Sequence, residues 1–275
     1  MQTIEWLKKN WLASGLTAYV VYRLMANQGS LVTNYVLLIA LLAFALRPPE
    51  WRARVATLIC LVLIATIFVR ESYIAPRQFL NLVSNTPPPW FAPVNVEVYM
   101  GGERLIVSPM DRNVGSYSSI ACFHTEDGLT LATAHGVSYD SGKVLVRLDD
   151  SPDARTEYAT IACNDFGVVF PTLREPVGEK IPIANIDEIE LAKAEVRQLG
   201  KAPIELEVKG YHYSGPVTFL VLWGEEPARQ GYSGSPIIQN GKLIGSVYGY
   251  LRVSNRIWLA RLATDLYQQV STMTP

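Results

Sequence analysis

The sequence has little cysteine. Its 275 residues include three, Cys60, Cys122 and Cys163, and their spacing matches neither a disulfide framework nor a zinc site. Cys60 lies in an apolar run, so at most one disulfide remains available. The sequence therefore excludes a disulfide-stabilised scaffold and predicts no metal site.

The chain also lacks an excess of charge of either sign. Lys and Arg number 24 and Asp and Glu 25, which gives a net charge of −1. A large basic field, which nucleic-acid binding requires, is absent, so no nucleic-acid partner is predicted. The sequence contains no Walker loop, dinucleotide fingerprint or internal repeat, and it implies no cofactor.

Apolar residues are abundant, at 49% of the chain, and they concentrate before residue 70. Residues 31–46 and 55–69 hold no charge and lie near the lower length limit for a membrane span, about 17–25 residues. Residues 11–25 form either an interfacial amphipathic helix or a short first crossing. We predict a multi-pass integral membrane region over residues 1–84 with two or three hydrophobic helices. The alternative is a pair of buried core helices.

The loop between the two apolar runs carries three arginines, Arg47, Arg52 and Arg54. The positive-inside rule places this loop in the cytoplasm, so residues after 70 emerge on the opposite side if both runs span. A re-entrant segment or a further crossing would leave them in the cytoplasm, and both topologies stay open. Residues 85–93 contain three consecutive prolines and predict a stiff linker before a second domain at residues 94–275.

After the linker, short strands separated by turn residues predict a mostly β domain of two barrels. The strands expected in the first barrel are 94–98, 104–107, 119–124, 130–133, 144–148, 156–163 and 167–170. Those expected in the second are 195–198, 204–213, 217–223, 236–239, 243–250 and 256–259. Asn240-Gly241 predicts a two-residue hairpin turn, and residues 263–272 predict a C-terminal helix.

The stretch around Ser233 reads Gln230-Gly231-Tyr232-Ser233-Gly234-Ser235-Pro236. Glycines on this spacing suit a tight turn that exposes a hydroxyl and leaves backbone N–H groups available to an anion. We interpret Ser233 as a nucleophile, with the N–H groups of Gly231 and Ser233 as the oxyanion hole. An ordinary hairpin turn is the alternative.

Two other stretches, both predicted to be strands, supply a candidate base and a candidate acid. His135 follows the apolar run 129–134 and is surrounded by small residues, and Asp165 lies inside the apolar run 161–170. An unpaired buried carboxylate is unfavourable, so Asp165 needs a partner. Taken one at a time, a core histidine and a turn aspartate are the simpler interpretations. The three together favour a catalytic set.

The order His135, Asp165, Ser233 and the Gly-x-Ser-Gly context resemble the chymotrypsin-like serine proteases, a family of double β-barrels. The spacings of 30 and 68 residues resemble the compact sobemovirus and polerovirus proteases, which follow membrane segments in a viral polyprotein. Bacterial membrane-anchored proteases share parts of the pattern. The resemblance implies a serine endopeptidase with protein or polyprotein substrates, anchored in a lipid membrane, the host membrane if the chain is viral.

The resemblance also implies roles for these residues. His135 would take the proton of Ser233 and return it to the leaving amine, while Asp165 orients the imidazole. It places the primary specificity pocket between two walls, at positions 227–230 and 246–249. The pocket residues expected are Pro227, Ala228, Ser246, Val247, Tyr248 and Gly249. Neither wall carries an acid, which favours an uncharged side chain at the cleavage position.

Two other histidines are weighed beside His135. His124 is the other candidate for the base, but it precedes Thr125-Glu126-Asp127 and is expected to be solvated. Some viral relatives read an acidic or amide substrate side chain with a second-barrel histidine, but His212 precedes the serine here, so we assign it a structural role. Two further functions stay open. One is a bacterial protease held outside the cytoplasm, and the other is a protease-like module that binds peptides without catalysis.

Overall fold

The structure is a computed structural model of the 275-residue chain. It describes residues 75–109, 117–133, 143–148, 156–159, 162–164, 167–172, 175–176, 178–214, 217–251 and 254–273. The chain divides into two compact units, residues 1–78 and residues 79–275. The second unit begins at Phe79, a few residues before the predicted linker, and it contains all the strands that the structure describes.

The described part of the first unit is the start of α5 (Ala75–Leu80), a helix of six residues. Within the described ranges, no helix has the length and apolar character needed to cross a membrane. The runs predicted to do so, at 11–25, 31–46 and 55–69, lie outside the described residues.

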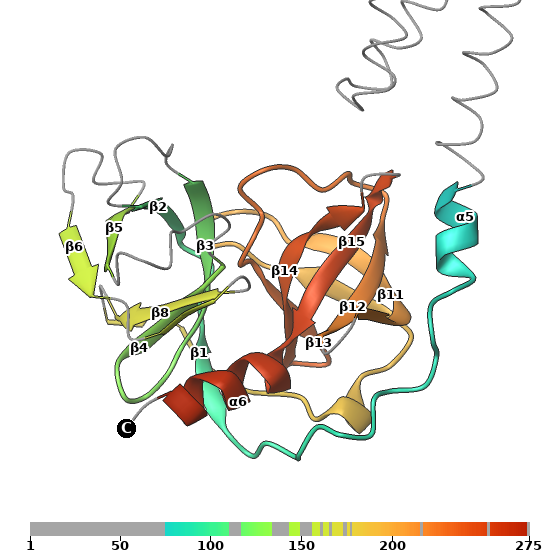
Figure 1. The fold of residues 1–275 in the computed structure, drawn as a ribbon, viewed down its shortest axis with the longest axis horizontal. Helices are drawn as coiled ribbons and strands as arrows, with labels where there is room; N and C mark the ends of the chain where they lie inside the picture. The colour runs from blue at the N-terminus through green and yellow to red at the C-terminus, as the bar shows by residue number, and fades with distance from the viewer. Residues whose placement is uncertain are drawn as a thin grey trace, which may run out of the picture. The chain divides into compact units, whose positions relative to one another are not determined.

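The first half of the second unit forms a nine-stranded antiparallel sheet (Figure 1). Its main path is β6-β5-β2-β3-β4-β8-β7, with β1 beside β3 and β9 beside β1. The strands are β1 (Glu97–Met100), β2 (Arg104–Pro109), β3 (Tyr117–His124), β4 (Leu129–Ala132), β5 (Lys143–Leu148), β6 (Thr156–Ala159), β7 (Ala162–Asn164), β8 (Gly167–Pro171) and β9 (Lys180–Pro182).

The second half closes into an antiparallel barrel in the order β10-β11-β12-β15-β14-β13. Its strands are β10 (Lys193–Val196), β11 (Ile204–Ser214), β12 (Val217–Gly224), β13 (Pro236–Gln239), β14 (Lys242–Leu251) and β15 (Ser254–Leu262). A short 3-10 helix, η2 (Ile186–Glu188), precedes β10. Leu206 and Val208 on β11 point inward, while Glu205 and Glu207 are exposed. This period-two alternation is what a strand with one buried face requires.

The predicted hairpin turn between β13 and β14 is confirmed. Asn240 and Gly241 both have positive φ, +51° and +74°, and Gln239 pairs with Lys242 across the turn. Two central residues with positive φ match the right-handed twist of the two strands, and Asn-Gly adopts this conformation readily.

A shared apolar cluster joins the two sheets. It contains Phe123 of β3, Leu243 of β14, and Leu266 and Val270 of α6 (Ala263–Met273). Figure 1 shows α6, in red, following β15 at the end of the chain. This cluster therefore packs the first sheet, the barrel and α6 against one another.

The strand pattern differs from the sequence prediction in the first sheet. The pairings of the described strands form a path from β6 to β7, and closure of this sheet into a first barrel stays a prediction. The single strand expected at 156–163 is two strands, β6 and β7, which pair with different neighbours. The prediction missed β9, which is only three residues long and therefore has almost no periodicity to read.

Candidate active site

Ser233 lies in a double turn between β12 and β13. The N–H of Tyr232 donates to Arg229 O at 3.3 Å, and the N–H of Ser235 donates to Tyr232 O at 3.0 Å. Gly231 and Gly234 have φ values of +88° and +91°, which only glycine adopts without strain. The glycine spacing in the sequence thus reflects the backbone conformation of this turn.

The Ser233 turn is held between the first sheet and the barrel. Ser233 O accepts the N–H of Ile120, on β3, at 2.7 Å, and on the other side Gly234 N–H donates to Val247 O, on β14, at 2.7 Å. A Cβ on Gly234 would lie 2.0 Å from Ile120 O. Glycine is therefore required at position 234 both for its φ and for the close approach of β3.

The side chain of Ser233 is half-exposed, so a substrate can reach it. Its Oγ donates to Tyr248 O at 3.4 Å, a long hydrogen bond. On the same turn, Gly231 is also half-exposed, and its N–H has no acceptor among the described residues. A backbone donor with no acceptor among the described residues, beside a half-exposed serine, is one of the two parts that an oxyanion hole needs.

His135 and Asp165 lie outside the described residues, but the strands that lead to them are described. β4 ends at Ala132, three residues before His135, and β7 ends at Asn164, directly before Asp165. Both strands pair with β8, and at the same place. Val168 is opposite Ala132 on one side and opposite Cys163 on the other.

The same row of residues continues to the Ser233 turn. Ala132 is paired with Ala121 of β3, and the neighbouring Ile120 is the donor to Ser233 O. The row Ala121, Ala132, Val168, Cys163 crosses four adjacent strands, which lie about 4.8 Å apart. β4 and β7, the strands that precede His135 and Asp165, thus both end within one residue of this row, and β3 contacts the Ser233 turn one residue away from it, at Ile120.

The six predicted pocket residues differ in exposure. Ala228, Ser246 and Val247 are buried, whereas Pro227, Tyr248 and Gly249 are half-exposed. Ser246 is hydrogen-bonded to the Cys122 thiol of β3, and burial raises the pKa of Cys122 to about 12. A substrate side chain can therefore contact Pro227, Tyr248 and Gly249, and a Cβ on Gly249 would meet nothing within 4 Å.

His124 is buried, which shows that the expectation of a solvated ring was wrong. Its Nδ1 is 2.8 Å from Thr130 Oγ1, and its Nε2 is 2.6 Å from Glu103 Oε1. The prediction rested on the acidic residues that follow His124 in the sequence. It could not identify Glu103, which lies directly before β2 and contacts the ring. With both ring nitrogens engaged, His124 acts as a structural residue. His212 is half-exposed, and its ring lies 5.0 Å from that of Phe79.

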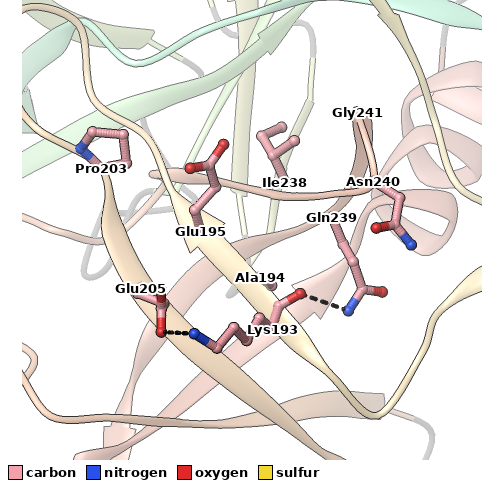
Figure 2. A pocket seen from close by; sticks show the side chains of 9 residues that line it. All are labelled: Lys193, Ala194, Glu195, Pro203, Glu205, Ile238, Gln239, Asn240 and Gly241. Carbon is pink, nitrogen blue, oxygen red and sulfur yellow. Dashed lines mark hydrogen bonds and ion pairs between the residues drawn. The ribbon is translucent and has the colours of Figure 1, made fainter.

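A separate hollow of about 320 Å³ lies on the outside of the barrel and includes none of the predicted site residues. Figure 2 shows that Lys193 and Glu205 at its rim form an ion pair, at 2.7 Å. Gln239 in its wall donates to Lys193 O at 3.1 Å. The polar groups of Lys193, Glu205 and Gln239 at this hollow are therefore bonded to one another. In the described part of the chain, no group of His, Cys, Asp and Glu side chains is arranged to bind a metal.

Comparison with known proteins gives partial structural likenesses. No protein-family model matches the sequence, and no curated protein matches it. The active form of the Rv3671c protease from M. tuberculosis is similar, at 17% identity and a TM-score of 0.49, over 62% of this chain and 80% of that one. The serine endoprotease from Yersinia pestis is similar at 17% identity and a TM-score of 0.45, over 64% of each chain. At these scores the likenesses carry no argument about activity.

Proposed function

We propose that this chain is a serine endopeptidase in which Ser233 attacks the peptide carbonyl, His135 is the general base and Asp165 orients His135. The observation that supports the proposal most is the paired row across β3, β4, β8 and β7: the strands that precede His135 and Asp165 end within one residue of this row, and β3 bonds the Ser233 turn beside it. The half-exposed Ser233 and the Gly231 N–H, which has no acceptor among the described residues, support the same chemistry.

In this mechanism His135 removes the Ser233 proton as Oγ attacks, and the N–H groups of Gly231 and Ser233 stabilise the oxyanion. His135 then donates the proton to the leaving amine, and water hydrolyses the acyl-enzyme by the same steps in reverse. Each step uses groups of the chain alone, so the proposed reaction needs no cofactor.

The test is peptide hydrolysis by the full-length chain in detergent. Ser233→Ala and His135→Ala should each remove nearly all turnover, about a 10⁴-fold loss or more, because triad members act as a unit. Ser214→Ala, on an exposed strand end of the same barrel, is the matched control and should keep wild-type turnover. A folded wild type that cleaves no peptide in a diverse library would instead favour the peptide-binding module.

We further propose that the chain is anchored in a lipid membrane through residues 1–84. The charge-free runs at 31–46 and 55–69 support the anchor. The described residues that follow them also expose large apolar side chains, Leu82 at 75% and Trp90 at 60%. An exposed tryptophan that follows a predicted membrane span in the sequence is typical of membrane interfaces. The expected result is that alkaline carbonate leaves the chain in the membrane pellet, and extraction into the supernatant would contradict it.

Processing of a viral polyprotein stays a prediction from the resemblance, and an extracytoplasmic bacterial protease is the alternative. Their topologies differ, so single cysteines at Lys201 and at the Asn240 turn separate them. Both positions are exposed on the second unit. In a background without Cys60, Cys122 and Cys163, labelling of these positions by an impermeant maleimide in intact cells or sealed vesicles identifies the side of the membrane.

A further inference from the structure

Tyr232, which lies between Gly231 and Ser233, has a side chain that packs against the barrel core. Its ring stacks on the indole of Trp258 with the centroids 5.6 Å apart and the planes 16° from parallel. Trp258 is on β15 and is fully buried. Tyr232, the residue next to the proposed nucleophile, therefore packs on one of the largest side chains in the core.

Trp258 itself has little room to move. Its Nε1 donates to Glu226 O at 3.2 Å. A Cβ on Gly224 would lie 3.0 Å from the same nitrogen, so the indole is packed closely against β12. Stacked aromatic pairs stabilise a core beyond the burial of their surface, so this stack is a stable support.

The Tyr232 hydroxyl provides a second attachment. It donates to Glu226 Oε1 at 3.1 Å, and Arg229 Nη2 lies 4.0 Å from the same oxygen. Burial and the bond to Glu226 raise the pKa of Tyr232, so the hydroxyl stays protonated and remains a donor. Glu226 thus binds Tyr232 by its side chain and Trp258 by its backbone.

These contacts fix the direction of the turn. The Tyr232 ring packs against the barrel core, and Tyr232 is half-exposed like its neighbours Gly231 and Ser233. The Tyr232 backbone is fixed too, since its N–H donates to Arg229 O and its O accepts from Ser235 N–H. Rotation of this turn would require the ring to leave the stack.

We propose that Tyr232, supported by Trp258 and Glu226, is a positioning residue that holds the N–H groups of Gly231 and Ser233 toward the developing oxyanion. This inference rests on the proposed function. The sequence pattern pointed to the glycines and the serine, and it gave Tyr232 no role. Oxyanion stabilisation depends on donors that are already in place, and a small displacement of the donors weakens it steeply.

The proposal predicts a loss in kcat with little change in KM. Tyr232→Phe keeps the ring and removes the hydroxyl, and it should lower kcat by about 3–10-fold, the effect of one ordinary hydrogen bond. Tyr232→Ala removes the stack as well and should lower kcat by about 100-fold, comparable to the loss of an oxyanion donor. Glu226→Gln keeps an acceptor oxygen and should remain near wild type, while Glu226→Ala should match Tyr232→Phe.

The experiment measures kcat and KM of the full-length chain per active site, with the sites counted by stoichiometric reaction with a fluorophosphonate. Tyr213→Phe is the matched control, because it also removes a tyrosine hydroxyl bond, to Thr86 O at 2.7 Å. The control should keep wild-type kcat. If Tyr232→Ala does not fold, Tyr232→Phe and Glu226→Ala carry the test.

A folded Tyr232 variant with wild-type kcat per titrated site, or with a raised KM alone, would overturn the positioning role and leave the proposed function intact. A wild type in which the fluorophosphonate never phosphonylates Ser233 would contradict the proposed function and the role of Tyr232 with it.

Discussion

At the scale of single residues, the site depends on how closely two backbones approach. Gly234 contacts β3 so tightly that its missing side chain leaves space for Ile120 O. The bond from Ile120 N–H to Ser233 O uses the same approach. A substitution at position 234 therefore changes the place of Ser233 relative to the first sheet.

Gly234→Ala tests this approach against backbone strain alone. Gly241→Ala is the matched control, because Gly241 also has positive φ but nothing lies within 4 Å of its added Cβ. The control should lose about 1–2 kcal/mol of stability from the left-handed backbone. Gly234→Ala should lose more and should also lower turnover, as measured by denaturant unfolding and peptide hydrolysis. Equal losses in the two variants would contradict the steric account.

At the scale of elements, β3 and β14 meet at the bond between the Cys122 thiol and Ser246. Because burial raises the pKa of Cys122 from 9.0 to about 12, the thiol stays protonated in the folded chain at alkaline pH. The folded state then binds a proton that the unfolded thiol has lost above about pH 9, so this group makes the free energy of unfolding fall as pH rises from about 9 to 12.

The rate at which the Cys122 thiol is alkylated measures whether the contact between β3 and β14 stays closed in the folded chain. In a variant with Cys60 and Cys163 replaced by serine, iodoacetamide at pH 8.5 should leave native Cys122 unmodified, since the thiolate is the reactive form. It should modify Cys122 fully in denaturant. Rapid modification of the native chain would mean that the contact between the two sheets opens.

The sequence predicted the elements of the second barrel well, for physical reasons. Ile204 to Ser214 and Val217 to Gly224 alternate or run apolar over eight residues or more, and Asn240-Gly241 has a turn chemistry that few residue pairs share. Contacts between residues that are far apart in the sequence could not be predicted in the same way. Neither the contact of His124 Nε2 with Glu103 Oε1 nor the stack of Tyr232 on Trp258 has a local pattern in the chain.

At the scale of the whole molecule, the second unit is held together by a core that both sheets share. Leu266 of α6 is buried in the cluster that contains Phe123 of the first sheet and Leu243 of the barrel. A proposed site that draws residues from both sheets requires such a core, because independent movement of the sheets would separate Ser233 from the others.

Leu266→Ala should destabilise the two sheets together, by about 2–5 kcal/mol as for other buried leucines. Leu191→Ala is the control, since Leu191 is 45% exposed, and it should change stability by less than about 0.5 kcal/mol. Trp258 fluorescence, with the other tryptophans replaced, reports the barrel, and Cys122 reactivity reports the contact with β3. Both signals should change at one denaturant concentration, and two separate transitions would contradict a shared core.

The most direct test of the central claim is covalent labelling of Ser233. A fluorophosphonate should modify wild type at one site per chain, and mass spectrometry of the digested protein should place the adduct on the peptide that contains Ser233. Labelling should vanish in Ser233→Ala and should slow by about 10³-fold or more in His135→Ala, because the base that activates the hydroxyl is gone. A folded wild type that takes up no label, or that labels equally fast without His135, would contradict the assignment of Ser233, His135 and Asp165 to one site.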